Sequence, residues 1–110
     1  MQVEIEELWW ARVASLFDAE GSIRKTQACF DIAMCDRDLI QMCKDVTGVN
    51  KKICERVLPS GKTQYRIWFT GKATVKRCLT RMLPYLGERR TAQAKQLLQW
   101  IEEAPNKSYA

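Results

Sequence analysis

The segment that decides the fold is residues 13–21, which read Val13-Ala14-Ser15-Leu16-Phe17-Asp18-Ala19-Glu20-Gly21. Apolar residues recur at helical spacing through residues 4–20, which predicts a helix that Gly21 ends. Asp18 and Glu20 therefore stand in the last turn, where the helix dipole disfavours carboxylates by about 0.3–1 kcal/mol each. A bound hard cation such as Mg²⁺ would compensate them. The alternative interpretation needs no metal: Asp18 caps the helix or pairs locally, and Glu20 is a solvated acid.

One stripe of this predicted helix consists of small residues. It repeats every four positions, at Ala11, Ser15 and Ala19, with Ala14 and Asp18 beside it. Small side chains let two helix backbones approach closely. The stripe fits either a helix packed on its own sheet or a symmetric contact with a second copy of the chain. In that contact two Glu20 carboxylates would meet, and divalent cations would relieve their repulsion.

Composition excludes several classes of protein. The chain has 110 residues and no histidine, which excludes His general bases, Ser-His-Asp triads and His-ligated metals. We expect one domain over residues 1–104 and a polar tail at 105–110. No run approaches the roughly 18 apolar residues of a membrane span. The acidic start is not typical of a targeting peptide, so we expect a cytoplasmic or organellar protein.

The five cysteines are odd in number and never spaced Cys-x-x-Cys, which argues against a disulfide framework and a zinc knuckle. We expect reduced thiols that lie mostly in the core. They are Cys29, Cys35, Cys43, Cys54 and Cys78.

The net charge of +5 is unevenly distributed. The first 20 residues hold five acids against Arg12 alone, whereas the chain from Arg24 onward holds 17 Lys+Arg against eight acids. An acidic element beside a basic remainder is the pattern expected for a metal site next to a phosphate-binding surface.

The first half of the chain continues with a hairpin and a helix. Residues 21–34 alternate with period two, which predicts two short strands joined near Lys25-Thr26. Asp36 is a good N-cap for a second helix, and Gly48 ends it.

The second half repeats this order. Residues 51–58 and 63–70 are predicted strands, joined by a Pro59-Ser60-Gly61-Lys62 turn. A third helix ends at Pro84, and a last helix runs over about residues 88–102. The predicted class is α+β.

The sequence resembles the LAGLIDADG homing endonucleases. Residues 13–21 stand where that family reads Leu-Ala-Gly-Leu-Ile-Asp-Ala-Asp-Gly, and Gly21-Ser22-Ile23 opens the first strand as it does in the family. Residues 30–39 are similar to the family's strand-to-helix junction, and residues 84–94 are similar to the basic start of its closing helix. The resemblance spans residues 8–101 in the same order.

The resemblance implies an αββαββα fold whose saddle-shaped antiparallel sheet straddles the DNA major groove. A single motif implies a homodimer with both motif helices at the two-fold axis, in contact through Ala11, Ala14, Ser15 and Asp18. It also implies a Mg²⁺-dependent endonuclease, with Mn²⁺ in substitution, that cuts both strands of double-stranded DNA. Glu20 and the Ala19 carbonyl would be metal ligands. Arg89 or Arg90 would lie near the scissile phosphate, and a one-residue offset leaves both open.

The outer face of the sheet would contact DNA. Arg and Gln suit bidentate contacts to base edges, whereas Lys mainly adds attraction to phosphate. Ordinary exposed strand faces are also polar, which is the competing interpretation. The candidates are Arg24, Lys25, Lys52, Arg56, Lys62, Gln64, Arg66 and Trp68.

Three departures from the family pattern support an alternative. Ser15 replaces the usual glycine, Met34 and Cys35 stand where the family often has a polar group, and the first hairpin is short. The alternative is a weakly catalytic or inactive relative that acts as an intron RNA maturase or a DNA-binding regulator. Glu20 favours the nuclease, whereas Met34 and the short hairpin favour a binder. A gene in an intron, in an intein or free-standing fits either function. A third function, a structural or protein-interaction module, is the least favoured, because the predicted sheet faces are basic.

Overall fold

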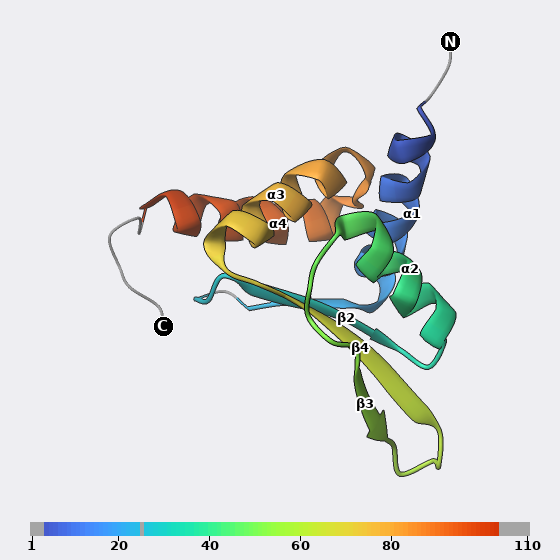
Figure 1. Ribbon diagram of the computed structural model, residues 1–110. Helices are drawn as coiled ribbons and strands as arrows, with labels where there is room; N and C mark the ends of the chain where they lie inside the picture. Colours follow the sequence, from blue (N-terminus) through green and yellow to red (C-terminus); the bar gives the residue numbers. More distant parts are fainter. Residues whose placement is uncertain (1–3, 25, 104–110) are drawn as a thin grey trace.

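An antiparallel sheet of four strands lies against four helices, all on one of its sides (Figure 1). This computed structural model describes residues 4–24 and 26–103. The elements are α1 Ile5–Glu20, β1 Gly21–Ile23, β2 Cys29–Met34, α2 Arg37–Thr47, β3 Cys54–Val57, β4 Thr63–Thr70, α3 Lys72–Met82, the 3-10 turn η1 Leu83–Tyr85 and α4 Glu88–Glu103. The αββαββα order implied by the resemblance is confirmed, and the last helix predicted over about residues 88–102 follows it as α4. Lys25 and the predicted tail lie outside the described residues.

The strand order β1-β2-β4-β3 puts β2 and β4 at the centre of the sheet. Phe30 pairs with Phe69 and Ile32 with Ile67, and all four side chains are fully buried beneath the helices. Because side chains alternate across a strand, the residues between them occupy the opposite, outer face. The helix layer therefore leaves that outer face of the sheet uncovered.

The core is centred where α1 crosses the sheet. The Phe17 ring lies 4.9 Å from that of Phe30, which stacks on Phe69 at 4.3 Å. Trp10 and Val13 extend the same buried face of α1. Burial of three aromatic rings fixes α1 against the central strands. None of the described helices is long and apolar enough to cross a membrane.

Two predicted features differ in detail. The strand predicted over 51–58 is only Cys54–Val57, so Lys52 precedes it in the loop. All four residues of β3 are exposed, because this edge strand projects past the helix layer (Figure 1). Asp36 occupies the N-cap position of α2 without a side-chain cap bond, whereas Gly48 ends the helix in the left-handed conformation, as predicted.

The expectation that most cysteines lie in the core is wrong. Only Cys43 and Cys78 are buried, and burial raises the pKa of Cys43 to about 12. Cys29 is half-buried, and Cys35 and Cys54 are exposed. Cys29 and Cys54 lie on strands at outer-face positions that no helix covers.

Candidate functional site

The junction of α1 and β1 holds Glu20 in a fixed position. Strand β1 begins at the residue after α1 ends, and the Gly21 N–H donates to the Phe17 carbonyl. A Cβ at Gly21 would collide with the Phe17 ring and the Phe17 carbonyl oxygen. Glycine is therefore required here by close approach, and it sets Glu20 at the corner between helix and sheet.

Arg90 of α4 clamps this corner from inside. Its side chain is buried, and it donates to the carbonyl oxygens of Gly21 at 3.0 Å and Asp18 at 3.3 Å. The guanidinium carbon also lies 5.1 Å from the centre of the Phe17 ring. Burial lowers the pKa of Arg90, with the Arg89 charge as a second cause. Arg90 thus supplies the cation that the carbonyl end of α1 favours.

Asp18 is engaged within the protein. Its Oδ1 accepts the Gly87 backbone N–H at 2.9 Å, just before α4 begins. A carboxylate at that end of a helix is favourable, because the first N–H groups have no partner within the helix. The local role that the sequence left open for Asp18 is therefore the one observed.

Glu20 is free of such contacts. It is exposed, and no described residue bonds to its carboxylate. The last turn of α1 contains no basic residue, and the last carbonyls of a helix, including that of Ala19, lack partners within it. One carboxylate and one carbonyl fit a hard cation that takes its other ligands from phosphate and water. No three His, Cys, Asp or Glu residues cluster within the described chain, so one copy offers only this partial donor set.

The structure separates Arg89 from Arg90. Arg89 is exposed and lines a polar hollow of about 250 Å³ beside Gly21 and Ser22, which Gln93 and Gln96 complete. Arg90 lines the same hollow, but its side chain is buried. Its two terminal nitrogens donate within the protein, and its Nε has no hydrogen-bond partner among the described residues. Of the two arginines, Arg89 is thus the one whose side chain is exposed to solvent.

The predicted contact stripe on α1 needs a correction. Ser15 is exposed and Ala11 half-buried, but Ala14 is fully buried in the chain's own core and lies on no outer face. The start of α1 shows the opposite difference, because apolar side chains there are exposed instead of buried. Ile5 is 73% exposed and Leu8 56%, although their helical spacing suggested core positions.

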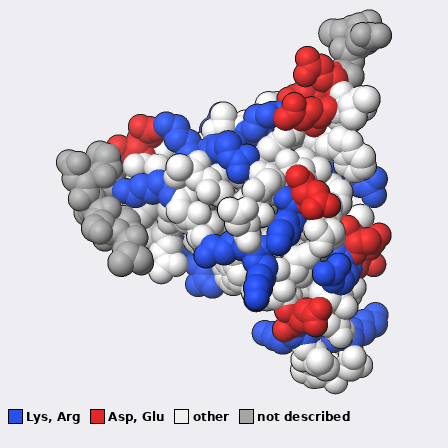
Figure 2. Space-filling view, viewed as in Figure 1, with Lys and Arg blue, Asp and Glu red and all other residues white. Residues whose placement is uncertain are grey.

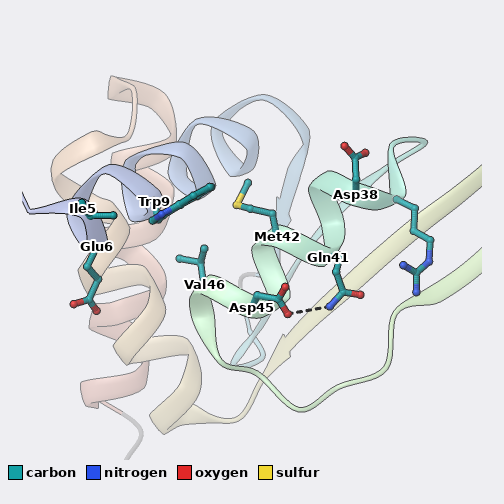
Figure 3. A pocket seen from close by; sticks show the side chains of 9 residues that line it. Ile5, Glu6, Trp9, Asp38, Gln41, Met42, Asp45 and Val46 are labelled. Carbon is teal, nitrogen blue, oxygen red and sulfur yellow. Dashed lines mark hydrogen bonds between the residues drawn. The ribbon is translucent and has the colours of Figure 1, made fainter.

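An apolar groove lies between α1 and α2. Ile5 and Trp9 face Met42 and Val46 across it, and the groove has a volume of about 770 Å³ (Figure 3). Glu6, Asp38 and Asp45 stand at its rim. The acids visible in Figure 2 gather mainly on the side occupied by α1 and α2. Within residues 4–24 and 26–103, this groove and the exposed apolar residues at the start of α1 are left uncovered, which is typical of an interaction surface.

Basic and aromatic residues meet on the outer sheet face. Arg24 and Arg66 both lie against Trp68, with their guanidinium carbons 5.6 and 5.4 Å from its ring centre. Arg56 pairs with Gln64 in the neighbouring row, so both occupy this face. The turn before β4 carries the exposed Lys62, and Lys52 is exposed before β3. Strand register and ring contacts thus place five of the predicted candidates on one face, namely Arg24, Arg56, Gln64, Arg66 and Trp68.

Asp31 was missed in the sequence. It is buried on this basic face, and its Oδ2 lies 2.9 Å from Arg66 Nε. The two residues are diagonal neighbours, because Asp31 pairs with Trp68 and Arg66 with Ala33. Only the register between β2 and β4 brings them together, and single-strand alternation does not reveal it.

No family profile and no curated protein matches the chain. Solved structures do match: two complexes of the homing endonuclease I-CvuI each align with a TM-score of 0.67 and 22% identity, over 92% of this chain and 70% of that chain. One holds its target Sro1.3 with 2 mM Ca, and the other holds the I-CreI target C1221 with 2 mM Mg and uncleaved DNA. The arrangement of helices and strands described above therefore has the LAGLIDADG homing endonuclease fold.

Proposed function

We propose that this chain is a LAGLIDADG-type homing endonuclease that hydrolyses both strands of double-stranded DNA. The observation that carries the proposal is Glu20, an exposed carboxylate without a partner among the described residues. Gly21 and the contacts of Arg90 hold its backbone at the corner between α1 and β1. A protein that only binds DNA gains nothing from an acid at this position, since it repels phosphate. The match to DNA-bound endonuclease structures supports the same activity.

Each part of the site has a role. Glu20 and the Ala19 carbonyl would hold Mg²⁺, or Mn²⁺ in its place. When bound, the metal would supply an activated water and stabilise the leaving oxygen. Arg89, exposed in the hollow beside Gly21, would neutralise charge on the scissile phosphate. The outer face around Arg24, Arg66 and Trp68 would bind the duplex.

A homodimer would complete this site. One chain supplies a single carboxylate, so a symmetric pair of α1 helices would bring two Glu20 side chains to one centre. Ala11, Ser15 and Ala19 leave room for that approach. The second copy would also cover the exposed apolar residues at the start of α1, Ile5, Leu8 and Trp9, and the groove between α1 and α2.

The second candidate function is DNA or RNA binding without efficient cleavage. It is favoured by Met34, which ends β2 opposite Tyr65 and supplies no polar group at the position where the family often has one. An intron RNA maturase or a DNA-binding regulator would keep the fold and the basic face.

Cleavage of a supercoiled plasmid library distinguishes the two functions. We predict linear product with wild-type protein and Mg²⁺, and a loss of at least about 100-fold in Glu20→Gln, because one metal-binding charge is removed. Glu103→Gln, an exposed acid at the far end of α4, is the matched control and should cut normally. Tight binding of DNA by wild-type protein without metal-dependent cutting would instead support the second function.

A further inference from the structure

The outer sheet face holds one buried acid among its basic residues. The side chain of Asp31 is 8% exposed, and that of Arg66 is 33% exposed. A buried carboxylate on a surface that binds phosphate is unfavourable for two reasons. Burial removes water from its charge, and the charge repels the phosphates of the DNA. We therefore expect Asp31 to have a specific role on this face.

The geometry fixes one edge of Arg66. Its Nε is buried and faces Asp31 Oδ2 at 2.9 Å as an ion pair, without an aligned hydrogen bond. The guanidinium also lies against the Trp68 ring. Asp31 pairs with the guanidinium at Nε, and the Trp68 ring packs against it. Its two terminal nitrogens therefore stay free for a bidentate contact. No described residue bonds to those nitrogens.

The neighbours of Arg66 leave its outer end open. In the register, Arg66 stands between Ala33 on β2 and Cys54 on β3, both of them small. Arg24, whose guanidinium carbon lies 5.6 Å from the centre of the Trp68 ring, has no carboxylate within ion-pair distance among the described residues. Burial raises the pKa of Asp31, while the Arg66 and Arg24 charges oppose that effect. Arg66 is thus the arginine on this face whose direction is set by an acid.

We propose that Asp31 is a positioning residue that aims Arg66 at a guanine in the major groove, which makes this pair a determinant of target specificity. Guanine presents its O6 and N7 acceptors side by side there, and they match the two terminal nitrogens of an arginine. This inference rests on the proposed function, because it requires the sheet face to bind duplex DNA.

Selection from a randomised duplex library tests the pair in buffer with EDTA, where binding occurs without cutting. Wild-type protein should select guanine at one position in each half-site. Asp31→Asn, which keeps the volume, should weaken that preference about tenfold and leave total DNA affinity nearly unchanged. Arg66→Lys keeps the charge but not the fork, and it should lose the same preference. The double variant should lose no more, because both residues act on one contact.

Arg56→Lys is the matched control, since Arg56 shares the face one row away and should leave that guanine position unchanged. Thermal melting shows whether each variant is folded. If Asp31→Asn does not fold, the guanine preference of Arg66→Lys is the measurement that tests the pair. Asp31→Asn with full guanine preference would overturn the inference, as would an equal affinity loss for all sequences. Wild-type binding without a guanine preference would also overturn it but leave the nuclease intact. A wild-type protein that binds no DNA would contradict the proposed function itself.

Discussion

At the scale of single residues, Arg89 and Arg90 are adjacent in sequence but differ in environment. Arg90 is buried and bonds to the backbone carbonyls of Asp18 and Gly21, whereas Arg89 is exposed in the hollow beside Gly21. We predict that Arg90→Met lowers the free energy of unfolding by about 2–4 kcal/mol, because bonds from a charged donor are lost and buried carbonyls stay unsatisfied. Urea unfolding measures this loss.

Arg89→Met is the matched variant for that experiment. It should change the free energy of unfolding by no more than about 0.5 kcal/mol, as surface substitutions usually do. It should nevertheless reduce DNA cleavage by about 100-fold, because a cation near the phosphate is removed. If Arg89→Met were the unstable variant, or if it cut normally, the roles assigned to the two arginines would be wrong.

At the scale of elements, α1 is tied to the end of α3 and to η1 by an ion-pair cluster. Glu7 accepts from the Tyr85 hydroxyl and from Arg81 at 2.8 Å, and Arg81 also lies over Trp10 at 4.9 Å. The Tyr85 hydrogen bond, with help from Arg81, lowers the pKa of Glu7 below its ordinary value of 4.5. A lowered pKa means that the folded state prefers the charged form.

This cluster predicts an acid-sensitive contribution to stability. It should be fully present above pH 4.5 and lost as the pH falls through the folded-state pKa of Glu7. The urea midpoint of Glu7→Gln should therefore lie below that of wild type at neutral pH and converge with it in acid. Tyr85→Phe should show part of the same effect. A difference that persists unchanged in acid would contradict this account.

Local periodicity predicted the helices and strands well. The residues that meet at the site depend instead on how each helix is rotated and on how distant strands pair. The alternation in residues 63–70 and the glycines at 21 and 48 set element bounds correctly because those signals are local. Which arginine of α4 faces inward depends on the rotation of that helix against Phe17. Ala14 fails as a contact residue for the same reason, and Asp31 meets Arg66 only through the pairing of distant strands.

At the scale of the whole molecule, the dimer predicts different effects for two neighbouring substitutions. Ser15 is exposed on α1, so Ser15→Leu should separate the two helices and give monomers in sedimentation velocity while the single chain stays folded. Ala14 is fully buried, so Ala14→Leu should overpack the core and cost about 1–3 kcal/mol of stability. A wild-type protein that sediments as a monomer, or a dimeric Ser15→Leu, would place the contact elsewhere.

The central claim is that two chains share one cutting site, each through its Glu20. Co-expression of wild-type and Glu20→Gln chains in varied ratios, followed by counting all Mg²⁺-dependent strand breaks in plasmid DNA, nicked as well as linear, measures this directly. Chains that cut independently would still nick one strand in a mixed dimer. If both carboxylates are required, activity follows the square of the wild-type fraction, so an equal mixture retains about a quarter of the wild-type rate. Activity that falls in proportion to the wild-type fraction, with about half left in that mixture, would contradict the shared site.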